Sequence, residues 1–279
     1  KNHPDVYDSP IASLDFHVDT ADFSGTNNGT RLEIYYGVPL NDVVTPNRTE
    51  GTLEQGIALF DSTWTPVYRK LKPLRFRVSE DEEMLKGTLV IDELALNVAP
   101  GQYWLGVQVG DPEQGIQGAY TQELIVEGYQ DAGLSISDIE MAGRVTEGKT
   151  PLKGGFDVLP LPSRTYRPGQ PVTIYYEVYG LERDSFRQTK YQMDYKIRPL
   201  RGKLSAVRII RALGTLLGME EKAVVTISYE RSGREEIEFN YLEIDMGKSR
   251  KGRYELEVAI TDRANEATSV KKAVFHIAD

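Results

Sequence analysis

The chain has 279 residues, of which 40% are hydrophobic, and a formal net charge of −9. This length predicts two domains with separate cores, and the negative charge argues against general binding to the phosphate backbone of nucleic acids. The absence of cysteine excludes disulfides, thiolate metal ligands and a cysteine nucleophile.

The start of the chain, KNHPDVYDSP, reads like the interior of a longer protein, so we expect a mature form or a fragment. No signal peptide is visible in it. No apolar run in the sequence reaches membrane-spanning length. Sixteen Tyr, 25 Gly and 14 Pro favour strands and turns over helices.

The first clear element is RLEIYYGVPL, residues 31–40, where Leu32, Ile34 and Tyr36 alternate with residues of the other face. Alternation of this kind predicts a half-buried strand. A closely similar sequence, VTIYYEVYGL, occurs again at residues 172–181. The chain therefore contains an internal repeat about half its length apart.

A second motif is duplicated in the same order. PGQYWLGVQVGD at residues 100–111 matches KGRYELEVAITD at residues 251–262, and each is preceded and followed by a further predicted strand. The interval from Ile34 to Tyr103 is 69 residues, and the interval from Ile174 to its counterpart Tyr254 is 80, so the second copy must hold an insertion. We expect two copies of one all-β unit.

Tyr103 and Tyr254 each follow a glycine by two positions and precede an apolar strand residue. This pattern is typical of the tyrosine corner of immunoglobulin-type sandwiches, in which the hydroxyl bonds back to the backbone. The sequence thus predicts an all-β fold of two tandem immunoglobulin-like or fibronectin-like β-sandwich domains, 1–130 and 131–279. Without cysteine, their cores must rest on apolar packing.

The string Gly143 to Thr150 fits the phosphate-loop pattern G-x-x-x-x-G-K-T. A phosphate loop needs a helix directly after it, because the helix N-terminus binds the phosphates. Pro151 follows at once and disfavours helical angles at Thr150. We interpret the string as a polar linker turn and expect no nucleotide binding.

The insertion is predicted to be a short amphipathic helix at about 203–218. Its basic side chains stand out in an acidic protein. One interpretation is that it caps its own sandwich; the other is that it docks on an acidic partner protein or an anionic membrane surface. The candidate interaction residues are Lys203, Arg208, Ile210, Arg211, Leu213 and Leu217.

Trp104 is a further candidate interaction residue. It lies between Tyr103 and Leu105, so alternation places it on the face opposite the core. Its counterpart in the repeat is Glu255, a residue typical of solvent. An outward Trp needs cover, which leaves three alternatives: a neighbouring domain or loop, an external partner, or a stacked sugar.

No catalytic, cofactor or metal site is predicted. His3, His17 and His276 are scattered without metal-ligand spacing, and no Ser/His/Asp grouping or nucleophile elbow is found. Asp111 and Asp262 end matching strands, where we expect turn roles in preference to a cation site.

The second half resembles the C-terminal β-sandwich region of bacterial envelope proteins that contain a GWxTD domain. The residues that carry the resemblance are Phe156–Leu181, TKYQMDYKIRPL and KGRYELEVAITD. The Gly-Trp-x-Thr-Asp string itself is absent. The resemblance implies exported modules in the periplasm or envelope and no established reaction.

These observations favour a non-enzymatic protein–protein interaction or scaffold module, a structural subunit of a larger envelope assembly. Its partners would be other proteins or a membrane surface, with no cofactor and no nucleic acid. The alternative is a carbohydrate-binding module of a secreted or surface protein, which several aromatics aligned on one sheet face would favour. A carboxylate-based hydrolase has no spacing in the sequence to support it.

Overall fold

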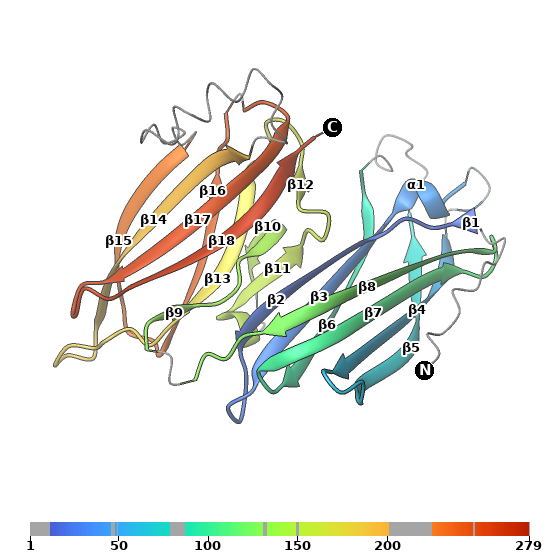
Figure 1. The fold of residues 1–279 in the computed structure, drawn as a ribbon. Helices are drawn as coiled ribbons and strands as arrows, with labels where there is room; N and C mark the ends of the chain where they lie inside the picture. The colour runs from blue at the N-terminus through green and yellow to red at the C-terminus, as the bar shows by residue number, and fades with distance from the viewer. Residues whose placement is uncertain are drawn as a thin grey trace, which may run out of the picture. The chain divides into compact units, whose positions relative to one another are not determined.

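The computed structural model describes residues 12–45, 48, 50–78, 87–130, 133–148, 151–200, 225–247 and 249–278. These residues form an all-β protein built mainly from antiparallel sheets, as predicted (Figure 1). Two short helical turns interrupt the strands: α1, Leu40–Val43, and a 3-10 turn, Pro151–Lys153. The predicted helical insertion lies outside the described residues.

The first copy contains a five-stranded sheet of order β1-β8-β7-β4-β5 and a three-stranded sheet of order β2-β3-β6. In the larger sheet the first pair is parallel and the others are antiparallel. The strands are β1 Ala12–Ser13, β2 His17–Ser24, β3 Thr30–Pro39, β4 Glu50–Asp61, β5 Pro66–Arg77, β6 Leu89–Val98, β7 Gly101–Asp111 and β8 Ile116–Val126.

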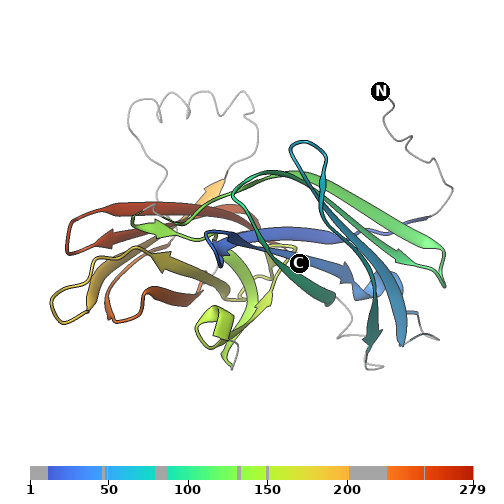
Figure 2. The same ribbon diagram turned by 90° about the horizontal axis from the view of Figure 1, so that it is seen from below.

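The second copy repeats this plan. Its larger sheet has the order β12-β18-β17-β14-β15, again with a short first strand in parallel, and its other sheet has the order β11-β10-β13-β16 with β9 also paired to β13 (Figure 1). The paired strands β17 and β18 are the red hairpin of Figure 2. The matching orders confirm the duplication. The strands are β9 Ser135–Ile136, β10 Glu140–Glu147, β11 Phe156–Pro160, β12 Thr165–Tyr166, β13 Val172–Tyr179, β14 Thr189–Leu200, β15 Val225–Gly233, β16 Ile237–Ile244, β17 Gly252–Asp262 and β18 Thr268–Ile277.

The chain divides into two compact units that are not simply its two halves. Unit 1 comprises Lys1–Asp19, Ile34–Leu94 and Ala99–Glu127. Unit 2 comprises Thr20–Glu33, Ala95–Val98 and Gly128–Asp279. Two segments of the first half of the sequence therefore belong to unit 2, which a boundary placed by sequence order alone does not anticipate.

Strands β3 and β13 are both buried on their two faces, so the expectation of a half-buried strand is wrong in each copy. Ile174 and Tyr176 join the apolar core between the two sheets of unit 2. Tyr175 and Glu177 point to the opposite face and are also almost completely buried. The prediction failed because alternation in the sequence shows which side chains share a face, but not whether other residues cover the second face.

A cluster of charged side chains covers that second face. Arg31 binds Glu177 at 2.6 Å and Glu33 at 2.9 Å. Lys153, from the 3-10 turn, binds Glu140 at 2.6 Å and Glu33 at 2.8 Å. We call these five residues the buried charge cluster. Because removal of charges from water is costly, the cluster is tolerable only while every charge keeps its partners.

Aromatic groups complete the environment of the buried charge cluster. The hydroxyls of Tyr175 and Tyr179 donate to the two oxygens of Glu177 at 2.9 and 2.7 Å. The guanidinium of Arg31 lies 4.6 Å from the ring centre of Phe23. Burial alone would lower the pKa of Arg31, but the charges of Glu177 and Glu33 raise it above its ordinary value.

Both predicted tyrosine corners are present. The hydroxyl of Tyr103 donates to the carbonyl of Ala99 at 2.7 Å, and the hydroxyl of Tyr254 donates to the carbonyl of Arg250 at 2.6 Å. The preceding glycines, Gly101 and Gly252, both have a φ of 155°, a backbone conformation that residues other than glycine rarely adopt. The two copies therefore use the same local device at the same strand.

We expect Tyr103→Phe and Tyr254→Phe each to lower the free energy of unfolding by about 1–2 kcal/mol, because each leaves a backbone carbonyl without its partner. Tyr241→Phe is the matched control, since this tyrosine is 46% exposed. Denaturant titration measures the difference. Two corner variants as stable as the control would contradict the assignment.

We expect Lys153→Met to lower the free energy of unfolding by about 3–5 kcal/mol, because two buried carboxylates lose their cation. Lys272→Met, which removes a cation that is about half exposed, should cost less than about 1 kcal/mol. Burial would lower the pKa of Lys153, but Glu140 and Glu33 raise it. The stabilisation should therefore be complete below the unfolded pKa of about 10.4 and decline as pH rises through the folded pKa. Equal losses for the two variants would contradict this account.

Candidate functional site

The β4–β5 hairpin in unit 1 displays Trp64 over Trp104. The two indole rings stack with centroids 5.2 Å apart and an interplanar angle of 12°. Phe60 lies directly opposite Trp104 on the neighbouring strand, and its ring is 6.0 Å from that of Trp64. We call these three residues the aromatic platform. Trp104 thus receives its cover from a loop, one of the three alternatives that the sequence left open.

Asp61 fixes the turn that carries Trp64. Its Oδ1 accepts hydrogen bonds from the backbone N–H groups of Thr63 and Thr65 at 2.8 and 2.9 Å, and from the Thr63 hydroxyl at 2.6 Å. The Thr63 hydroxyl and these backbone groups lower the pKa of Asp61, so the carboxylate stays charged. Trp64 is held at φ 64°, a conformation unusual for a bulky residue. The turn therefore presents the indole in a defined position.

A shallow groove crosses the outer face of the five-stranded sheet beside the aromatic platform. Its volume is about 260 Å³. The floor is formed by small residues, Gly56 and Ala58 on β4, Gly106 on β7 and Ala119 on β8. The Ala58–Gly106 pair lies two residues along the strands from the Phe60–Trp104 pair, on the same outer face. The groove therefore adjoins the aromatic platform at about 6.6 Å.

The rim of the groove carries polar, charged and apolar side chains. Arg69 and Leu71 of β5 form one side, opposite Ala58 and Gly56. Gln108 and Thr121 lie further along the same face. Arg69 forms no salt bridge within the described part of the chain, so its guanidinium is available to an anion.

The duplication supplies an internal comparison for this face. In the second copy, the positions of Ala58, Gly106 and Thr121 are taken by Lys196, Glu257 and Lys272, as the strand registers show. These charged residues pair with one another: Lys272 lies 3.2 Å from Glu257, and Lys196 lies 3.8 Å from it. One copy therefore has an ordinary solvated face, and the other has a groove with small residues.

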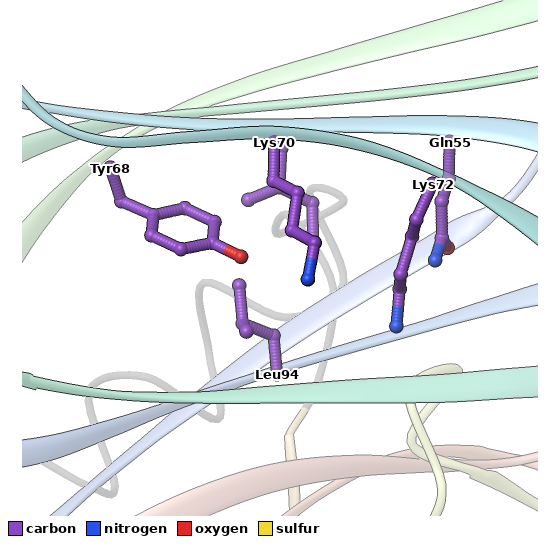
Figure 3. Close-up of a pocket in the computed structure, with 6 residues that line it drawn as sticks. Gln55, Tyr68, Lys70, Lys72 and Leu94 are labelled. Atoms are coloured by element: carbon purple, nitrogen blue, oxygen red, sulfur yellow. The ribbon is translucent and has the colours of Figure 1, made fainter.

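A second cavity, of about 30 Å³, lies on the inner side of β5 (Figure 3). Tyr68, Lys70 and Lys72 of β5 point toward it, with Leu94 of β6 opposite (Figure 3). Gln55 is buried and its Oε1 has no hydrogen-bond partner among the described residues. A cavity of this size fits one water molecule, which would satisfy that oxygen.

Asp92 organises the polar groups beside this small cavity. It accepts a hydrogen bond from Gln55 at 2.8 Å and contacts the Lys72 ammonium and the Tyr36 hydroxyl. Burial would raise the pKa of Asp92, but these three donors lower it below its ordinary value. The carboxylate is therefore engaged within unit 1, and we interpret the cavity as part of its interior.

The aspartates at the matching strand ends have the expected turn roles. Asp111 Oδ1 accepts from the backbone N–H groups of Glu113 and Gln114, both at 3.1 Å. Asp262 accepts from the N–H of Ala264 at 2.9 Å and of Glu182 at 2.7 Å. The carboxylates therefore close equivalent turns in the two copies.

The first five residues of the phosphate-loop string lie on a strand and not, as expected, in a linker turn. Its first part, Gly143 to Glu147, belongs to β10, which pairs with both β11 and β13. Lys149 and Thr150 lie outside the described residues. The 3-10 turn after it spans three residues and leads into β11. Pairing of Arg144–Glu147 with β11 overrode the turn signal in this part of the string.

The other predicted candidates are scattered or not described. His17 and His276 are exposed on separate strands, and His3 lies outside the described residues. The same holds for the six insertion residues, whose interaction role stays a prediction: Lys203, Arg208, Ile210, Arg211, Leu213 and Leu217. Within the described ranges, no three His, Cys, Asp or Glu side chains gather as metal ligands, and no helix there has the length and apolar character to cross a membrane.

Sequence reasoning missed Trp64, Phe60 and Arg69 as members of this surface. Trp64 lies in the turn between β4 and β5, and nothing in the sequence shows that this turn folds back over Trp104. Only the register of β4 against β7 shows that Phe60 lies opposite Trp104, and the sequence does not give that register.

Comparisons with known proteins give only remote likenesses. No family model matches the chain, and no curated protein matches it. Among solved structures, it is similar to Escherichia coli alpha-2-macroglobulin activated by porcine elastase, at 10% identity and a TM-score of 0.24 over 97% of this chain and 22% of that one. It is similar to a calcium-binding mutant of Bacteroides uniformis beta-glucuronidase 2, at 8% identity and 0.28 over 94% and 28%.

The fibronectin(III)-like modules of Clostridium thermocellum CbhA are a third likeness, at 11% identity and a TM-score of 0.21, over 97% of this chain and 92% of that one. The chain spans about a fifth of the length of the macroglobulin. Because all these TM-scores are low, none of the likenesses carries an argument about function.

The chain has two Trp, and both belong to the aromatic platform. We therefore expect an exciton couplet in the circular dichroism spectrum that is lost completely in Trp64→Phe and in Trp104→Phe. Phe186→Leu, at an exposed turn of unit 2, should leave the couplet unchanged. A signal that survives Trp64→Phe would contradict the stacked arrangement.

Proposed function

We propose that this chain is a non-enzymatic interaction module that holds another molecule on the outer face of the five-stranded sheet of unit 1. That face exposes large apolar side chains, which monomeric proteins rarely gather in one place without a partner. Trp64 is 63% exposed, Leu71 77% and Ile125 78%. Aromatic residues and arginine, both present here, are the residue types enriched where proteins bind partners.

The observation that carries the proposal is the difference between the two copies. Each copy needs an outer face compatible with water, and the charged pairs of the second copy meet that need. The first copy has Gly106, Ala58 and the aromatic platform at the corresponding positions. Folding does not require that replacement, because the second copy folds on the same plan without it. Binding of a partner supplies a reason for it.

The resemblance to envelope proteins supports a place for this module in the periplasm or envelope, as a structural subunit of a larger assembly. Tandem sandwiches present loops and sheet faces at defined positions, which suits a scaffold. In this proposal the predicted basic insertion is a second contact, toward a protein or a membrane surface.

One specific observation favours carbohydrate binding as the second candidate function. Phe60, Trp104 and Trp64 gather on one sheet face, next to a groove, which is the arrangement that the carbohydrate alternative requires. The two candidates agree that the face binds, and they differ in what it binds.

Photo-crosslinking in the native host tests whether the face is occupied. A photoreactive side chain at Leu71 or Ile125 should give a reproducible crosslinked product, because both positions border the proposed contact. Val270 is the matched control, since it is 50% exposed and takes the position of Ala119 in the second copy. Products at Val270 equal to those at Leu71, or none at either test position, would refute the proposal.

A further inference from the structure

The exposed side of Trp64 is a rigid, flat, apolar surface. One face of its indole lies on Trp104, and the side chain is still 63% exposed. Asp61 fixes the turn through two hydrogen bonds from backbone N–H groups and one from the Thr63 hydroxyl, so little conformational freedom remains to be lost on binding. Flat aromatic faces with partial negative charge attract the C–H groups of a sugar ring. A preorganised indole of this kind suits a ring-shaped ligand.

The turn geometry does not by itself explain the choice of Trp. A turn of the same type occurs between β13 and β14 of unit 2. There Asp184 Oδ1 accepts hydrogen bonds from the N–H groups of Phe186 and Gln188 at 2.8 and 2.9 Å. There the residue with positive φ is Arg187, at 60°, next to the solvent-exposed Phe186. An ordinary polar residue is therefore sufficient for this turn. Trp64 differs in that it lies on a second indole and beside a groove.

The groove is long and shallow, with an apolar floor and polar side chains at its rim, which suits the C–H faces and hydroxyl groups of an extended glycan. It crosses β5, β4, β7 and β8, a width of about 14 Å at the usual strand spacing. Its volume of about 260 Å³ is slightly below the usual lower limit of about 300 Å³ for enclosed ligand pockets. The side chains of Gln108 and Thr121 offer hydrogen bonds to hydroxyl groups.

The charges around the groove select the kind of ring. Arg69 projects from β5 opposite Ala58, with no salt bridge among the described residues. Glu123 lies beside Trp104 and accepts a hydrogen bond from Gln102. An anionic group is therefore favoured near Arg69 and disfavoured near Glu123, where hydroxyl donors fit instead. In a chain of net charge −9, a guanidinium that has no salt-bridge partner among the described residues and lies on a binding face points to an anionic ligand.

We propose that the groove binds an extended glycan that carries carboxylate groups. A sugar ring stacks on Trp64, the chain crosses the floor at Gly106, and a carboxylate pairs with Arg69. This inference rests on the proposed function and names the ligand class of the same face.

Titration with polygalacturonate tests the proposal, with laminarin as the neutral glycan and poly-glutamate as the acidic peptide. Both Trp residues are in the site, so intrinsic fluorescence reports binding directly. We expect saturable binding of polygalacturonate, weaker binding of laminarin, and no competition by poly-glutamate at equal charge. Trp64→Ala, followed by affinity electrophoresis, should weaken binding by about tenfold or more, as loss of one aromatic stacking contact predicts.

Two further variants separate charge from shape. Arg69→Gln should abolish the preference for polygalacturonate over laminarin and reduce the salt dependence of binding. Gly106→Glu introduces the residue that the second copy carries at this position, and an added Cβ meets no atom closer than 3.9 Å, so the sheet should fold while the groove is blocked. Phe186→Ala removes an exposed aromatic side chain from unit 2 and should leave glycan binding unchanged.

Two outcomes would overturn the inference. The first is that neither glycan binds the wild-type chain. The second is that poly-glutamate competes as well as polygalacturonate and Trp64→Ala has no effect, which would assign the face to an acidic peptide. If the face binds another class of partner, crosslinked products at Leu71 would still form in the native host. The glycan inference can therefore fail while the proposed function holds.

Discussion

The buried charge cluster of unit 2 is the constraint on which the arrangement of the chain depends. Arg31 and Lys153 are surrounded by Glu33, Glu140 and Glu177, and each ion is deeply buried. Such a set is costly to assemble and still more costly to leave incomplete. Because Arg31 and Glu33 come from the first half of the sequence, unit 2 cannot complete this set without residues 20–33. The duplicated sequence therefore does not fold as two independent consecutive halves.

Duplication explains both what the copies share and where they differ. The corner tyrosines, Tyr103 and Tyr254, and the turn aspartates, Asp111 and Asp262, hold the same positions, because strand ends and sheet crossings need them in any copy. The outer faces carry no such requirement, so one could keep paired charges while the other acquired small residues and the aromatic platform. The same freedom applies to the β4–β5 and β14–β15 connections, which are equivalent in the topology. Trp64 lies in the first, and residues 201–224, including the predicted insertion, lie in the second.

The proposed glycan site uses this freedom without disturbing the core. Leu105 and Val107 face inward and are buried, while Trp104 and Gly106 alternate with them on the outer face. A binding surface on the outer face of a sheet is therefore built by changing alternate residues only. Because core and surface residues alternate along each strand, a stable sandwich can gain a binding site without any change in its core.

The sequence by itself determined the all-β class, the duplication, both tyrosine corners and the outward direction of Trp104, because these follow from local periodicity and short motifs. It did not determine that β3 and β13 are buried on both faces, that the first part of the phosphate-loop string lies on β10, or that Trp64 folds over Trp104. Those features depend on strand register and on contacts such as that of Arg31 with Glu177, across 146 residues of sequence. Periodicity records which way a side chain points, and only the tertiary structure decides what meets it there.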